Sequence, residues 1–118
     1  MIVNCYAPTS IVAKNKPKEL DDFYKDVQDV IDIRQNKEVY LCGDFNARLG
    51  KRKLEDNSFR GSYGHGCKNE SGEKLEEFLS ANDLFACNPS FKHAAKRITT
   101  WNATKKIFWP HCVSWFRK

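Results

Sequence analysis

The stretch LCGDFNARLG, at positions 41–50, gives the strongest indication of the fold in this sequence. An apolar run stops at Gly43, and Asp44 and Asn46 follow it two residues apart. Residues i and i+2 of an extended segment point to the same side, and glycine lets the backbone leave a strand without a side chain in the way. The stretch therefore predicts a buried strand that delivers a carboxylate and a carboxamide to the rim of a sheet, where both can meet one phosphate or one metal-bound water.

The residues before this stretch predict a strand, a helix and a second strand. Residues 2–6 form a short apolar run that Pro8 ends, because proline cannot continue a ladder. Residues 9–17 are polar, and we expect a mobile loop there. Apolar residues recur at three- and four-residue spacing from Pro17 towards Asn36, which predicts a helix, and a strand follows over 38–44. We expect a right-handed crossover that places both strand tips at the ligand-binding edge of the sheet.

The residues after the stretch predict a long loop and a second helix. Residues 48–70 are rich in glycine and basic side chains, which is typical of a long surface loop. A helix is expected from about 72 to 82 with Ser71 as its N-cap, and short strands over 84–87 and 98–101. The fold class is therefore α/β, in the order strand, helix, strand, loop, helix, strand, strand.

Composition and charge restrict the class of protein. The chain has 118 residues, of which 41% are hydrophobic and 30% charged, as in ordinary globular domains. Its net charge is +5, and no acid follows Asp83, so residues 84–118 are strongly basic. That segment is either a phosphate-contacting tail or a solvated terminus. The five cysteines show no C-x-x-C spacing, so zinc and redox motifs are unsupported. Cys5, Cys42 and Cys87 lie in apolar runs, which favours core packing for these three.

No run approaches the ~20 apolar residues of a membrane span, and the first residues lack the pattern of a signal peptide. We therefore expect an intracellular protein, nuclear or cytoplasmic and not secreted, that has no membrane partner. The sequence does not indicate an oligomeric state.

Three motifs together resemble a known superfamily. The GDFN motif of the opening stretch is accompanied by VNCYAP at 3–8 and ITTW at 98–101. This set resembles the endonuclease/exonuclease/phosphatase superfamily, which has the DNase I-like fold. Within it, the chain is most similar to the endonuclease domain of LINE-type non-LTR retrotransposon proteins and to craniofacial development protein 2-like proteins. The resemblance covers residues 1–103 and implies part of a layered sandwich; residues 104–118 do not match.

The resemblance implies a Mg²⁺-dependent endonuclease, with Mn²⁺ as an alternative ion, that hydrolyses DNA phosphodiester bonds. By position, Asp44 would activate water and contact the metal, Asn46 would hold a phosphate oxygen, and Tyr6 would lie near the scissile phosphate. The cations that follow, Arg48, Lys51 and Arg52, would contact the DNA backbone. Each of these residues also has a purely structural interpretation: a turn for Asp44 and Asn46, a half-buried aromatic for Tyr6, and a solvated loop for the cations.

The sequence also departs from the superfamily. The metal-binding Glu that precedes the YAP motif and the later Asp–His pair have no counterpart here. We therefore expect a central fragment of the domain that is inactive or incomplete as an enzyme. Two alternatives stay open: a non-enzymatic remnant or weak nucleic-acid-binding protein, and a phosphatase of the same fold.

Overall fold

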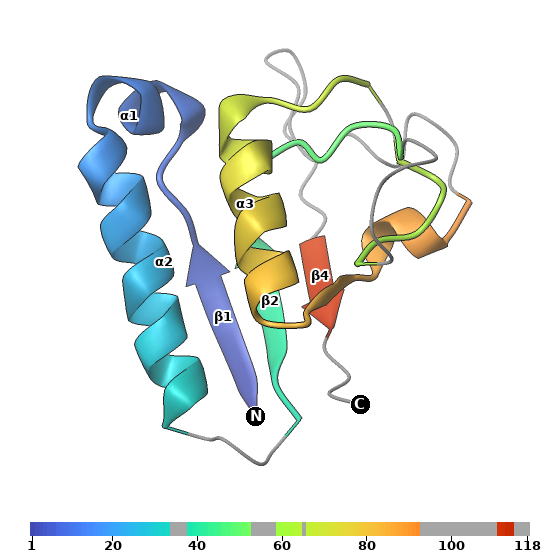
Figure 1. Cartoon of the computed structure of the whole chain (residues 1–118), viewed down its shortest axis with the longest axis horizontal. Helices are drawn as coiled ribbons and strands as arrows, with labels where there is room; N and C mark the ends of the chain where they lie inside the picture. Colours follow the sequence, from blue (N-terminus) through green and yellow to red (C-terminus); the bar gives the residue numbers. More distant parts are fainter. Residues whose placement is uncertain (34–37, 53–58, 65, 93–110, 115–118) are drawn as a thin grey trace.

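The computed structural model describes residues 1–33, 38–52, 59–64, 66–92 and 111–114, the last as backbone. The chain has a mixed α/β fold, as expected from its sequence. The elements, in chain order, are β1 (Ile2–Tyr6), α1 (Ser10–Asn15), α2 (Pro17–Asp32), β2 (Tyr40–Asp44), α3 (Glu70–Ala81), β3 (Phe85–Ala86), the 3-10 turn η1 (Asn88–Ser90) and β4 (His111–Ser114) (Figure 1). The strand expected over 98–101 lies outside the described residues.

Within the described residues, four strands form one sheet in the order β1-β2-β4-β3. β1 and β2 are parallel, with Ile2 opposite Tyr40 and Tyr6 opposite Asp44. β4 runs antiparallel to both β2 and β3. The parallel pairing predicted for the first two strands is therefore confirmed, and both strands end at the same edge. β4 lies within residues 104–118, the segment that sequence analysis did not assign to any motif.

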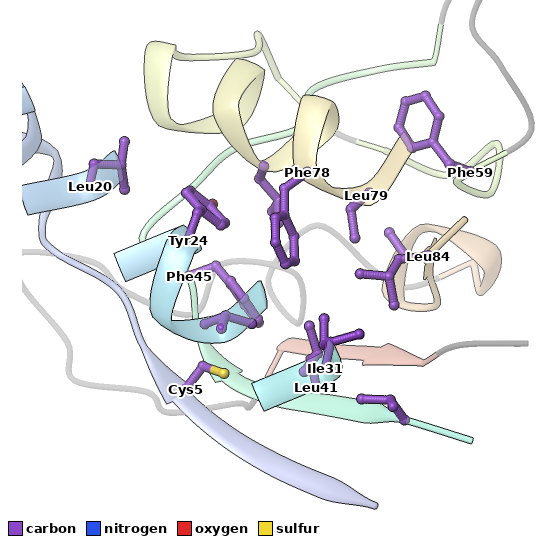
Figure 2. Close-up of a cluster of buried hydrophobic side chains, with 14 residues drawn as sticks. Cys5, Leu20, Tyr24, Ile31, Leu41, Phe45, Phe59, Phe78, Leu79 and Leu84 are labelled. Carbon is purple, nitrogen blue, oxygen red and sulfur yellow. The ribbon is translucent and has the colours of Figure 1, made fainter. Parts of the chain in front are cut away.

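Helices α2 and α3 cover one face of the sheet, and the hydrophobic core lies between these two layers (Figures 1 and 2). Leu41, Leu79 and Leu84 are almost completely buried in it. The opposite face is more open, since the side chains of Ile2 and Tyr6 are 76% and 72% exposed. The described residues thus form a helix layer on a sheet layer.

Helix α2 forms for the reasons that its sequence suggested. Pro17 occupies its first turn, where the missing N–H is no loss, and Glu19 adds a carboxylate near the positive end of the helix dipole. Its buried face carries Leu20, Tyr24, Val27 and Ile31. The helix ends at Asp32, four residues before the Asn36 that we expected to stop it, and β2 begins at Tyr40 rather than Glu38.

The prediction of a loop over 9–17 was wrong, because residues 10–15 form the short helix α1. The side chain of Thr9 caps this helix by accepting a hydrogen bond from the Val12 N–H at 3.4 Å. None of the residues of α1 is buried. A helix this short shows no apolar periodicity, so the threonine was the one local signal for it.

Two further expectations need correction. Helix α3 is capped by Asn69 rather than Ser71: the Asn69 Oδ1 accepts the Gly72 N–H at 2.9 Å, while Ser71 is buried within the first turn. The segment 48–70 is also more than a surface loop, since Phe59 and Arg60 in it are buried. Both differences arise from tertiary contacts that local patterns do not reveal.

Candidate functional site

The candidate site lies where β1 and β2 end side by side. Tyr6 and Asp44 are register partners in the parallel pair, and the pairing continues one residue further because the Ala7 N–H donates to the Asp44 carbonyl at 2.8 Å. The predicted meeting of the two strand tips at one edge is thereby confirmed. The backbone holds Tyr6 and Asp44 together before any side chain contributes.

A tight turn follows Asp44. Its Oδ1 accepts the N–H of Asn46 at 2.9 Å, and Asn46 has a left-handed φ of 45°. Phe45, between them, is 2% exposed and lies in the core, where its ring meets that of Phe23 edge to face. The buried ring of Phe45 anchors the turn, so that Asp44 and Asn46 stay half-buried at the edge of the sheet.

Asn46 also has a structural role that the sequence did not indicate. Its Nδ2 donates a hydrogen bond to the Ala7 carbonyl at 2.8 Å, which ties the turn to the end of β1. A carboxamide carries two donor protons and one acceptor oxygen. One proton is used in this bond, and the second remains available for a phosphate oxygen.

The two roles of Asn46 in the turn can be separated by mutation. We expect Asn46→Ala to lower the free energy of unfolding by about 2 kcal/mol, because alanine disfavours the left-handed backbone and loses the bond to Ala7. Asn46→Gly keeps the backbone geometry and should cost about half as much. Urea denaturation followed by circular dichroism measures both. Equal stability of all three proteins would contradict this account of the turn.

The Tyr6 side chain borders an open depression of ≈ 510 Å³ between β1 and the first two helices. The lining residues are Tyr6, Pro8, Thr9, Val12, Glu19, Asp22, Phe23 and Asp26. Asp44 and Asn46 do not line it. Three carboxylates on α2 make this side unfavourable for a phosphate chain, since like charges repel.

The basic residues on the other side are held in place through their backbone. The N–H of Arg48 donates to the Asn69 Oδ1 at 2.9 Å, and the N–H of Asn69 donates to the Arg48 carbonyl at 3.2 Å. The residue that caps α3 therefore also holds the backbone of Arg48, where residues 48–52 begin. We call residues 48–52 the basic loop. The side chains of Arg48, Lys51 and Arg52 are exposed, so the structure places all three of these predicted residues on the surface directly after the turn.

Arg60 is the residue that sequence analysis missed. Its guanidinium is buried and donates to the carbonyl oxygens of Leu49, Gly50 and Lys51, the last two at 3.2 and 3.5 Å. A buried cation needs hydrogen-bond acceptors, and here the acceptors are backbone carbonyl oxygens of the basic loop. Nothing local to Phe59-Arg60 signals this role, because the carbonyls that receive the bonds belong to a separate segment.

Asp44 is the one candidate metal ligand that sequence analysis named. Asp44 supplies one carboxylate, and one of its oxygens is engaged by the Asn46 N–H. Within the described ranges, no group of three or more histidine, cysteine, aspartate or glutamate side chains is arranged to hold an ion. Mg²⁺ is usually held by one or two carboxylates, with waters and substrate phosphate as its other ligands, and Asp44 is the carboxylate at this edge that could contribute.

Two buried side chains have raised pKa values. Burial, and to a lesser degree the nearby Cys42, raises the pKa of the Cys5 thiol, which agrees with the expectation that Cys5 packs in the core. Burial also raises the pKa of Tyr24 on α2. Both groups therefore stay neutral near pH 7 and contribute to packing.

In the described part of the chain, no helix is both long and apolar enough to span a membrane.

Comparison with curated proteins gives a clear similarity. The chain is 31% identical over 103 residues to craniofacial development protein 2 of Bos taurus. This chain resembles craniofacial development protein 2. The same protein of Tragulus javanicus is 29% identical over 103 residues. The matched part is 86% of this chain, which spans 17% of the length of either craniofacial development protein 2. No protein-family model matches the chain, and no solved structure does.

Proposed function

We propose that this chain contributes the substrate-contacting edge of a DNase I-like phosphodiesterase that acts on DNA. The observation that carries the proposal is the arrangement of Tyr6, Asp44 and Asn46 at one edge of two parallel strands, with basic residues directly after them. The similarity to craniofacial development protein 2 supports it. Acidic α2 on one side and the basic loop on the other would guide a phosphate chain across the strand tips towards Arg48.

The chemistry follows from the atoms at the edge. The Asp44 Oδ1 is engaged in the turn, and Oδ2 would take a proton from the attacking water. The water oxygen then bonds to phosphorus as the ester P–O bond breaks, and the leaving oxygen takes a proton from solvent and departs with the product strand as its hydroxyl. The second Nδ2 proton of Asn46 and the Tyr6 hydroxyl would donate to the phosphoryl oxygens, where negative charge develops.

The Asp44 carboxylate is the group whose loss should matter most for hydrolysis. Asp44→Asn keeps an oxygen for the Asn46 N–H and so preserves the turn, but it removes the base. We expect nicking of supercoiled plasmid, assayed with Mg²⁺, to fall about 10²-fold. The matched control is Asp29→Asn, an exposed aspartate on α2, which should nick at the wild-type rate. Equal rates for the wild type and Asp44→Asn would refute the proposal.

A second candidate function is nucleic-acid binding without hydrolysis. It is favoured by the single carboxylate at the site, because complete phosphodiesterases usually need further groups to stabilise the transition state. In that case the wild type would not nick plasmid, yet it would still bind DNA in EDTA. The affinity for DNA would fall steeply as salt is raised, as expected when phosphate contacts displace counterions.

A further inference from the structure

Three segments that are distant in the sequence pack against one another, and the first of them begins two residues after Asn46 in the chain. They comprise residues 48–52, 59–64 and 87–92 (green, yellow-green and orange in Figure 1). Arg60 of the second segment binds the Gly50 carbonyl of the first at 3.2 Å. The N–H of Tyr63 in the second donates to the Pro89 carbonyl of the third at 2.8 Å. The three segments therefore form one supported surface.

This surface exposes aromatic rings. Tyr63 is 47% exposed, and Phe91 is 61% exposed. Among the described residues, the one other aromatic side chain with comparable exposure is Tyr6, at the candidate site itself. Large aromatic side chains are usually buried, because removing their apolar surface from water lowers the free energy of the folded protein. Two of them on adjoining loops indicate a surface that a flat apolar ligand can cover.

The same surface is basic. Lys51, Arg52 and Lys92 are exposed on these loops, and no aspartate or glutamate occurs within 48–52, 59–64 or 87–92. Cations interleaved with exposed aromatic rings suit a ligand that combines phosphates with flat bases.

We propose that these residues, namely Tyr63 and Phe91 with Lys51, Arg52 and Lys92, form a binding surface for single-stranded nucleic acid. We call it the Tyr63–Phe91 surface. The cations contact phosphates, and the rings stack on bases. Unpaired bases are required because the faces of paired bases are already stacked within a duplex. The inference extends the proposed function: the strand that crosses Asp44 continues past Arg48 onto this surface, which selects substrates that are locally unpaired.

The test measures binding by fluorescence anisotropy, in EDTA so that no hydrolysis occurs. The probes are a labelled oligothymidine and a labelled hairpin duplex of the same length. We expect Tyr63→Ala and Phe91→Ala each to weaken oligothymidine binding about tenfold, and the double variant about a hundredfold, with duplex binding almost unchanged. Lys51→Gln should weaken both probes and reduce the salt slope by about one.

Control variants show whether the rings themselves matter. Tyr63→Phe and Phe91→Tyr keep a ring and should bind oligothymidine like the wild type. Ile11→Ala removes an exposed apolar side chain from α1, far from this surface in the chain, and should have no effect. The proposal is overturned if the double alanine variant binds oligothymidine as tightly as the wild type, or if it loses duplex binding to the same extent, as a protein-docking or purely structural role would predict.

The outcome is separable from that of the nicking experiment. The two experiments change different residues: the nicking assay compares the wild type with Asp44→Asn, and the anisotropy assay compares it with the Tyr63 and Phe91 variants. If Asp44→Asn nicks like the wild type while the aromatic variants lose oligothymidine binding, the phosphodiesterase proposal fails and the binding surface stands. If binding by the aromatic variants is unchanged while Asp44→Asn loses nicking, the binding surface fails and the phosphodiesterase proposal stands.

Discussion

Gly43→Ala should destabilise this protein by at least ~3 kcal/mol, and at that size the native fold can be lost altogether. Gly43 has a φ of 134°, in a region that side chains disfavour. A Cβ at this position would overlap the carbonyl oxygen of its register partner Cys5 and come within 2.8 Å of the carbonyl carbon. Because these atoms are backbone in the neighbouring strand, they cannot move without separating β1 from β2.

The matched control for this substitution is Gly66→Ala. Gly66 also has a positive φ, of 70°, but a Cβ there would meet no atom within 4 Å. Gly66→Ala should therefore lower the free energy of unfolding only through backbone strain, by about 1 kcal/mol. Guanidinium denaturation followed by circular dichroism compares the two variants. If they were equally stable, the close approach of the two strands at Gly43 would not be a determinant of the fold.

The second large effect is expected at Phe45. Phe45→Ala should lower the free energy of unfolding by about 3–5 kcal/mol, because a fully buried ring is replaced by a cavity. The ring is 2% exposed and packs edge to face on Phe23, with centroids 6.4 Å apart. Since Phe45 stands between Asp44 and Asn46, the loss should also loosen the candidate site.

Two variants set the scale for Phe45→Ala. Phe45→Leu fills most of the space and should cost less than half as much. Phe91→Ala removes a ring that is 61% exposed and should change stability by no more than about 0.5 kcal/mol. Thermal and urea unfolding of the three proteins would measure these differences. A Phe45→Ala variant as stable as Phe91→Ala would show that the turn is not anchored by this ring.

The parallel strands and their shared edge could be predicted because their signals are local. The apolar runs, the proline after Tyr6 and the glycine before Asp44 each act within a few residues. The two long helices were predictable for the same reason. The left-handed turn at Asn46 agrees with the ability of asparagine to adopt that conformation, although its bond to Ala7 depends on the neighbouring strand.

The features that sequence analysis missed depend on distant contacts. Asn69 and Ser71 are both good N-cap residues, and Asn69 is the cap that also binds the Arg48 backbone of another segment. Arg60 is buried because three carbonyls of the basic loop receive its guanidinium. Helix α1 is too short for its periodicity to be read. For Asn69 and Arg60, the residues that they contact lie in another segment of the chain. For α1, the helix itself is too short to show a pattern.

The position of β4 has a consequence for the order in which the molecule assembles. Tyr40 on β2 pairs with Ile2 on one side and with Ser114 on the other, so the second pairing has a high contact order and a large entropy of loop closure. The helix layer can form earlier, because α2 and α3, which pack through the Tyr24 and Phe78 rings at 4.9 Å, both precede β4 in the chain. During synthesis, one edge of β2 is therefore unpaired until β4 has been made. In that interval, this edge is most able to pair with a strand of another protein chain.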